Sequence, residues 1–214
     1  MNEGELRAAI VRVAQAMDRA GFAPSKSGNV SARLADGLLI TPSGLPYAAT
    51  TPDDLVTLDL DGGVREGGRK PSSEWPFHIA IYRARPDAGA IVHTHSPRAT
   101  ALSCARRALP AFHYMIALCG GADVRCADYA TFGSPELAAN AVRALEGRKA
   151  ALLANHGVIA LGATLEGAYA VAAEVENLAG QYLDLLAAGL EPVILDAEEM
   201  ARVAERFAGY GKVG

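Results

Sequence analysis

The chain has 214 residues, a formal net charge of -4, 50% hydrophobic residues and 21% charged residues. This length supports one sizeable core, so we expect a single domain over residues 1–214 with the composition of an ordinary globular protein. The mild acidity disfavours nucleic-acid and anionic-membrane partners, because both need a broad basic surface.

The residues near the amino terminus predict no signal peptide, because Glu3, Glu5, Arg7 and Arg12 interrupt the apolar residues there. No stretch approaches the roughly 18 apolar residues of a membrane span. The 3 cysteines lack CxxC spacing, which fits a reducing compartment and argues against cysteine metal ligands. We therefore expect a cytoplasmic protein.

The first part of the chain has the pattern of a helix followed by hairpins. Apolar residues recur at helical spacing over 3–20 and Gly21 follows them, which predicts a helix with a glycine stop. Two short apolar runs joined by Asp36-Gly37 predict a β-hairpin, and residues 55–60 begin a second one.

The rest of the chain alternates helices and strands. A helix is predicted from Glu74 to Arg85, where Pro86 blocks its continuation. The other expected helices begin at Ser96-Pro97 and span 135–146, 164–188 and 197–208, and the expected strands hold His93, span 113–118 and flank His156. The pattern predicts an α/β or α+β sandwich with a mostly antiparallel sheet between helices.

Three of the five histidines lie in apolar, strand-like surroundings. His93 and His95 are two positions apart, so on a strand their side chains share a face. His156 ends a second apolar run, just before Gly157. A lone histidine at a strand end is usually structural, but three imidazoles with an open fourth position are typical of a catalytic zinc site. Cobalt, nickel, manganese and iron also accept imidazole ligands, so residue type leaves the metal open.

Glu74 has two interpretations. A carboxylate at the start of a helix interacts favourably with the helix dipole, which is a purely structural role. If Glu74 instead lies beside the metal, it can ligate the resting site and transfer protons once substrate displaces it.

Three clusters of small polar residues offer backbone N–H groups with a hydroxyl or amide. They are Ser27-Gly28-Asn29, Thr41-Pro42-Ser43-Gly44 and Pro71-Ser72-Ser73. Each alone is an ordinary turn or cap, but together they could hold a phosphate without a lysine cluster. None resembles a P-loop or a GxGxxG fingerprint, so nucleotide binding is not indicated.

Taken together, these motifs resemble the class II aldolase/adducin family, and most closely its L-fuculose-1-phosphate aldolase group. The matching blocks are SGNVSAR, ITPSGLPY, KPSSEWPFH, PDAGAIVHTHSP, ALPAFHYMIALCGG, YATFGS and LLANHGV, and the likeness continues to GYG at 209–211. The resemblance implies a three-layer α-β-α sandwich with a mostly antiparallel central sheet. It also implies a Zn²⁺ cofactor, with Co²⁺ or Mn²⁺ as alternatives.

The resemblance assigns roles to individual residues. His93, His95 and His156 correspond to the zinc ligands, and Glu74 to the carboxylate that works as acid and base. Tyr114 corresponds to a proton donor lent by a neighbouring subunit, and Tyr210 to a mobile carboxy-terminal tyrosine that assists catalysis.

The resemblance also implies how substrate is held. The positions that correspond to the phosphate site are Gly28, Asn29, Ser43, Gly44, Ser72 and Ser73. Phe132 and Phe207 correspond to apolar residues at the aldehyde end, contributed across a subunit interface. The implied assembly is a homotetramer with sites between subunits, and the implied partner is a small phosphorylated sugar.

The expected activity is reversible cleavage of a 1-phosphoketose to dihydroxyacetone phosphate and a small aldehyde such as L-lactaldehyde. Candidate ketoses are L-fuculose 1-phosphate and related 5-deoxypentulose or methylthioribulose 1-phosphates. Two alternatives keep the fold but change the reaction: a phosphopentulose 4-epimerase and a methylthioribulose-1-phosphate dehydratase. A non-catalytic scaffold similar to the adducin head is an alternative of another class.

Overall fold

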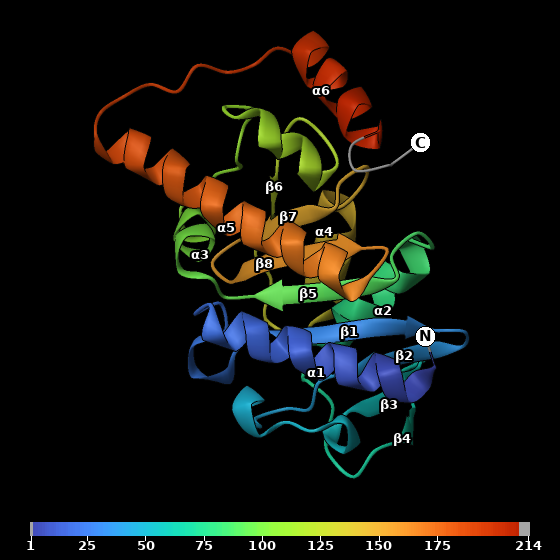
Figure 1. The fold of residues 1–214 in the computed structure, drawn as a ribbon. Helices are drawn as coiled ribbons and strands as arrows, with labels where there is room; N and C mark the ends of the chain where they lie inside the picture. Colours follow the sequence, from blue (N-terminus) through green and yellow to red (C-terminus); the bar gives the residue numbers. More distant parts are fainter. Residues whose placement is uncertain (1, 210–214) are drawn as a thin grey trace.

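The computed structural model describes residues 2–209, which form one sheet covered by helices on both faces (Figure 1). The strands lie in the order β4-β3-β2-β1-β5-β8-β7-β6. They are β1 (Asn29–Leu34), β2 (Gly37–Ile40), β3 (Val56–Asp59), β4 (Val64–Glu66), β5 (Ala90–Thr94), β6 (Arg125–Ala127), β7 (Ala150–Leu153) and β8 (Gly157–Gly162). Within the described residues only the β6–β7 pair is parallel, which confirms the mostly antiparallel sheet.

The helices form two layers, one on each face of the sheet, except for the last helix, which packs against the 3₁₀ helix Tyr114–Cys119 (Figure 1). They are α1 (Glu3–Arg19), α2 (Trp75–Ala84), α3 (Pro97–Cys104), α4 (Pro135–Ala144), α5 (Leu165–Ala187) and α6 (Ala197–Gly209). One core joins the sheet to α1, α3 and α5, and the other joins it to α2 and α4. This arrangement confirms the predicted three-layer α-β-α sandwich. Among the described helices, none is both long and apolar enough to cross a membrane.

Strand periodicity decides which side chains each core receives. In β5, Val92 faces the core beneath α1 and α5, whereas Ile91 faces the core beneath α2 and α4. His93 follows Ile91 by two positions and therefore lies on the α2 side of the sheet. Asn29 and Ser31 of β1 pair with His93 and Ile91, so they share that face.

One predicted element is wrong. Residues 113–118 are predicted to form a strand, but Tyr114–Cys119 form a 3₁₀ helix in which the His113 side chain accepts a hydrogen bond from the N–H of Met115. A short apolar run cannot be assigned to a strand or a helical turn by periodicity alone. The strand at this edge of the sheet is β6, a short segment that the sequence pattern did not indicate.

Helix α2 is tied to β1 at its carboxyl end. The guanidinium of Arg33 donates to the carbonyl oxygens of Tyr82, Arg85 and Ala88 at 2.7, 2.8 and 2.7 Å. Carbonyls at a helix end lack intrahelical donors, so these hydrogen bonds satisfy groups that burial would otherwise penalise. The contacts fix α2 against the strand that carries Asn29 and Ser31.

Candidate metal centre and substrate pocket

The three candidate imidazoles converge at one end of the central strands. His93 is the fourth residue of β5, His95 lies just beyond its end, and His156 lies in the turn between β7 and β8. Their ring centroids are 4.8–4.9 Å apart in every pair, and the rings cross at 73–77°. Each ring therefore packs edge to face against the other two, and we refer to these three imidazoles as the histidine tripod.

A backbone contact decides which nitrogen of His93 faces this tripod. Its Nδ1 lies 2.8 Å from the carbonyl oxygen of Val158, which can only accept a hydrogen bond. The neutral ring therefore carries its proton on Nδ1 and presents the Nε2 lone pair. That Nε2 lies 3.0 Å from Nε2 of His95. A hydrogen bond that fixes the tautomer of a histidine is typical of metal ligands.

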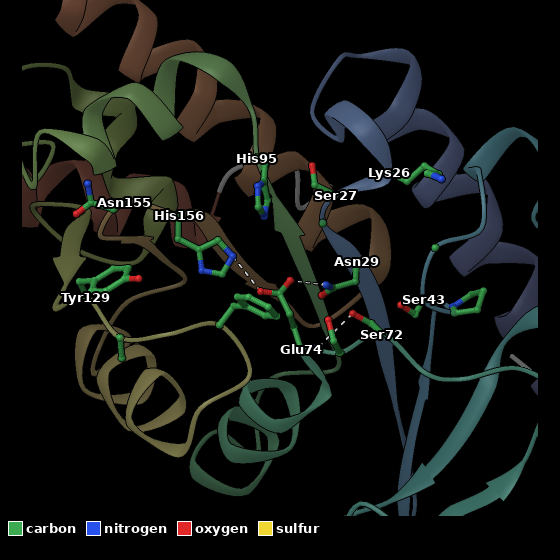
Figure 2. A pocket seen from close by; sticks show the side chains of 16 residues that line it. Lys26, Ser27, Asn29, Ser43, Ser72, Glu74, His95, Tyr129, Asn155 and His156 are labelled. Carbon is green, nitrogen blue, oxygen red and sulfur yellow. Dashed lines mark hydrogen bonds and ion pairs between the residues drawn. The ribbon is translucent and has the colours of Figure 1, made fainter.

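Glu74 completes the cluster from the amino-terminal end of α2. Its Oε2 lies 3.1 Å from Nε2 of His93, and its Oε1 lies 2.9 Å from Nε2 of His156. Figure 2 shows this carboxylate between His156 and Asn29. Burial acts to raise the pKa of Glu74, but the neighbouring His93 and His156 imidazoles hold that pKa well below its usual range. The carboxylate is therefore ionised.

The electrostatics of the cluster keep His95 neutral. Burial, together with the nearby His93 and His156 rings, lowers its pKa to about 3. An ionised carboxylate beside a neutral imidazole is the protonation state that metal coordination needs.

These residues fit a bound metal ion. The ligand atoms of Glu74, His93, His95 and His156 all lie within 4.8 Å of one another. Two ligands about 2.0–2.1 Å from one zinc at the tetrahedral angle are roughly 3.3 Å apart, close to the observed contacts. In addition, Oε1 of Glu74 is buried without a hydrogen-bond partner. Such an orphan is costly unless an ion or ligand satisfies it.

Tertiary contacts bring the three small-residue clusters together. Pro42 and Pro71 form an isolated β-bridge, and the N–H of Ser43 donates to Lys70 at 2.9 Å. Separately, the hydroxyl of Tyr47 donates to the carbonyl oxygen of Gly28 at 2.6 Å. All three clusters consequently line one pocket, which none could form alone.

The pocket has a volume of about 360 Å³ and borders the metal cluster. Its lining includes Gly28, Asn29, Ser43, Gly44, Ser72, Ser73, Glu74, His95, Phe132 and His156. Figure 2 shows Asn29, Ser43 and Ser72 on one side of Glu74 and His156 on the other. The structure thus brings together the candidate phosphate positions, two imidazoles and the carboxylate.

Two glycines allow this close arrangement. A Cβ on Gly28 would lie 2.6 Å from the carbonyl oxygen of His93, and Gly28 has a φ of +81°. A Cβ on Gly157 would lie 2.3 Å from the carbonyl oxygen of Thr94 and would also touch the rings of His93 and His95. The close approach of β5 therefore requires a glycine at position 28, which also lines the pocket.

The remaining candidate residues fall in different places. Phe132 lines the pocket and is largely exposed. Tyr114 and Phe207 do not line it; their rings stack on one another with centroids 6.2 Å apart. Tyr210 lies outside the described residues.

Several residues of the site were missed by sequence reasoning. Lys26, Tyr129 and Asn155 also line the pocket; Tyr129 and Asn155 lie in the blocks YATFGS and LLANHGV, but the resemblance assigned them no role. His78 and Ser31 form buried hydrogen bonds behind Glu74. Spacing could have indicated both, because His78 follows Glu74 by one helical turn and Ser31 follows Asn29 by two strand positions.

Comparisons with known proteins identify the family of this chain. The family model described as "Class II Aldolase and Adducin N-terminal domain" matches residues 8–183. A 5-methylthioribulose-1-phosphate/5-deoxyribulose-1-phosphate aldolase from Rhodospirillum rubrum is 52% identical over 96% of this chain and 92% of its own. An L-fuculose phosphate aldolase from Escherichia coli is 47% identical over 99% of this chain and 98% of its own.

A solved structure titled L-fuculose 1-phosphate aldolase has a TM-score of 0.91 and 42% identity, covering 95% of this chain and 96% of that one. The chain therefore belongs to the class II aldolase and adducin family. Within that family it is a class II aldolase, and so a lyase, of the fuculose-phosphate aldolase type.

Proposed function

We propose that this protein is a zinc-dependent aldolase that reversibly cleaves a 1-phosphoketose to dihydroxyacetone phosphate and a small aldehyde. The observation that carries the proposal is the cluster of Glu74, His93, His95 and His156, whose ligand atoms lie within 4.8 Å of one another beside a polar pocket. A scaffold protein has no need of such a costly buried set of imidazoles and a carboxylate.

The three histidines and resting Glu74 would hold the metal. Zn²⁺ bound there supplies a Lewis acid toward the ketose oxygens, which stabilises the negative charge left on C3 when the C3–C4 bond breaks. Co²⁺ or Mn²⁺ would be accommodated by the same donor set.

Glu74 would handle the proton on the three-carbon fragment. Oε1 lacks a hydrogen-bond partner in the protein, so this oxygen is available to carry a proton. In the cleavage direction we assign to Glu74, once substrate has displaced it, the uptake of a proton from water and its delivery to C3, which releases dihydroxyacetone phosphate.

The phosphate would be bound by Gly28, Asn29, Ser43, Gly44, Ser72 and Ser73. These residues line the pocket beside Glu74 and supply hydroxyl, amide and backbone N–H donors. Ser72 and Ser73 also precede α2, whose amino-terminal end favours negative charge. Anchoring the phosphate here would place the reacting carbons over the metal cluster.

The aldehyde half would be handled by residues from two subunits of a homotetramer. Tyr114 is half exposed and does not line the pocket of its own chain, which agrees with a role in a neighbouring site. We assign to its phenol the relay of the C4 hydroxyl proton, in which the phenol oxygen accepts that proton while its own proton passes to water, with Tyr210 assisting. Phe132 and Phe207 would form apolar walls around the departing aldehyde.

The names of the relatives support two groups of substrates. One is L-fuculose 1-phosphate, and the other comprises the 5-deoxy- and methylthio-pentulose 1-phosphates. These ketoses share the phosphorylated half and differ at the aldehyde end. A methylene-sized difference in an apolar pocket is worth only about 1–3 kcal/mol, so one enzyme can accept several of them.

The test is retro-aldol cleavage of L-fuculose 1-phosphate, 5-deoxyribulose 1-phosphate and methylthioribulose 1-phosphate, with and without a chelator. We expect chelator-sensitive release of dihydroxyacetone phosphate from at least one. The proposal fails if none releases it. NMR of the products would reveal an epimer or a dehydrated ketone, which would instead establish the epimerase or dehydratase reaction.

A further inference from the structure

A continuous chain of buried polar side chains connects the last turn of α2 to Glu74. The hydroxyl oxygens of Tyr82 and Ser31 are 2.8 Å apart, and the Ser31 hydroxyl lies 2.7 Å from Nδ1 of His78. Nε2 of His78 contacts Oδ1 of Asn29, and Nδ2 of Asn29 donates to Oε2 of Glu74 at 2.9 Å. Tyr82, Ser31, His78 and Asn29 are each no more than 1% exposed. We refer to these four residues as the relay.

The ionised carboxylate of Glu74 at one end of the relay decides the direction of every hydrogen bond in it. The ionised carboxylate of Glu74 can only accept, so Asn29 presents its N–H group there and its carbonyl oxygen to His78. Nε2 of His78 must therefore donate to that oxygen. A neutral imidazole then has an unprotonated Nδ1, which must accept from the hydroxyl of Ser31. Tyr82 in turn donates to Ser31, so all donors point toward Glu74.

His78 is neutral for a physical reason. Its hydrogen bonds go to Ser31 and Asn29, neither of which is a carboxylate, and a buried imidazolium without a carboxylate partner is costly. Burial accordingly lowers the pKa of His78 to about 3. Its ring also stacks against Phe77 with centroids 4.8 Å apart, which restricts its rotation.

The two carboxylate oxygens of Glu74 differ in their hydrogen bonds. Oε2 is held by Asn29, whereas Oε1 is buried with no hydrogen-bond partner. Glu74 precedes the first turn of α2 and has three rotatable side-chain bonds, so its backbone alone does not fix its carboxylate. Tethering one oxygen leaves the other at a defined position.

We propose that His78, supported by Ser31 and Tyr82, is a positioning residue that acts through Asn29 to orient the Glu74 carboxylate for proton transfer. This inference rests on the proposed aldolase function. It also gives Asn29 a role besides phosphate binding, because its amide bridges His78 and Glu74 and leaves one N–H for substrate.

The test compares variants of the zinc-loaded enzyme that break the relay at two points. His78→Phe removes both imidazole hydrogen bonds, whereas His78→Gln retains an amide N–H that can reach Asn29. Ser31→Ala removes the donor to His78. Ser103→Ala is the matched control, because its hydroxyl is equally buried and donates to the carbonyl oxygen of Thr100 within α3, outside the relay.

We expect kcat to fall about 100-fold in His78→Phe, the size of effect that a small misplacement of a reacting group produces. The loss should be about 10-fold in Ser31→Ala, and His78→Gln should recover most of what His78→Phe loses. KM for the ketose phosphate should change less than about threefold, because phosphate anchoring is intact. Ser103→Ala should match the parent enzyme.

Imidazole ¹⁵N NMR supplies a readout that does not depend on activity. The parent enzyme should show His78 as the neutral Nε2–H tautomer between about pH 6 and 8, and Ser31→Ala should lower the population of that tautomer. An imidazolium or an Nδ1–H tautomer in the parent enzyme overturns the proposal.

The remaining outcomes are equally decisive. If the parent enzyme is active and both relay variants keep its kcat with only a lower melting temperature, the relay is merely structural. Equal losses of kcat in Ser31→Ala and Ser103→Ala would also mean that the relay is merely structural. If His78→Phe does not fold, the difference in kcat between Ser31→Ala and Ser103→Ala decides whether the relay positions Glu74. If the parent enzyme is inactive, the proposed function is refuted instead. The tautomer of His78 seen by NMR then tests the direction of the hydrogen bonds in the relay.

Discussion

Oε1 of Glu74 and Nε2 of His156 lie 2.9 Å apart, yet Oε1 has no hydrogen-bond partner. The two atoms lie within ion-pair distance, but the contact is not counted among the hydrogen bonds of Oε1. This relationship is typical of two ligands that point toward a common ion. It links the carboxylate at the start of α2 to the turn between β7 and β8, and it motivates the first two predictions.

Replacing Glu74 with glutamine should preserve metal binding and abolish most turnover. The amide keeps the size of the side chain but cannot act as an acid or base, so kcat should fall about 10²–10⁴-fold. Glu136→Gln is the control, because Glu136 is an exposed carboxylate in the first turn of α4. Near-normal rates in Glu74→Gln would remove Glu74 from the proton-transfer role.

Removing one imidazole should release the metal. In His156→Ala the remaining donors are too few for a closed site, so zinc affinity should fall by more than about 100-fold, measured by competition with a chromogenic chelator. His113→Ala should retain zinc, because His113 caps a 3₁₀ helix away from the cluster. Undiminished zinc in His156→Ala would contradict the tripod.

Adding a single methyl group at Gly157 should destabilise the protein. Its Cβ would lie 2.3 Å from the carbonyl oxygen of Thr94, a backbone atom that cannot move without shifting β5. We expect Gly157→Ala to lower the free energy of unfolding by about 1–3 kcal/mol in urea denaturation. Gly68→Ala is the matched control, because its Cβ would meet nothing within 4 Å. Equal stabilities of the two variants would exclude the clash.

Acid should destabilise the protein partly through His78. Burial lowers the pKa of His78 to about 3 from an ordinary value of 6.5, so between these values the unfolded chain binds a proton that the folded chain does not. The free energy of unfolding therefore falls as the pH drops below about 6.5, by up to about 1.4 kcal/mol per pH unit.

The measurement for this prediction is urea unfolding of the parent protein and His78→Gln. Between about pH 7.5 and about pH 5, the parent protein should lose roughly 2 kcal/mol more than the variant, because glutamine does not titrate. Identical losses would mean that the pKa of His78 is the same in the folded and unfolded chains.

Tyr47→Phe should weaken substrate binding with little effect on the chemical step. The Tyr47 hydroxyl donates to the carbonyl oxygen of Gly28 at 2.6 Å and so holds one wall of the pocket. Loss of a buried hydrogen bond of about 1–1.5 kcal/mol should raise KM for the ketose phosphate roughly 10-fold. A fall in kcat at constant KM would place Tyr47 in the chemistry instead.

Much of the fold could be predicted because its signals are local. Helix ends at Gly21 and Pro86 and the hairpin at Asp36-Gly37 follow from backbone sterics, which neighbouring residues decide. The run 113–118 was assigned wrongly because a short apolar segment fits a strand or a helical turn equally well. Its 3₁₀ conformation is stabilised by the His113 side chain, which periodicity does not report.

The sequence by itself determined the components of the site. The two-residue period of a strand places His93 and His95 on one face, and the residue types specify imidazole and carboxylate donors. Only the tertiary structure decided which components meet. The register of β1 against β5 places Asn29 opposite His93, and packing of α2 brings His78 against Asn29. Periodicity acts over a few residues, whereas register and helix packing depend on contacts between distant segments, which no local pattern encodes.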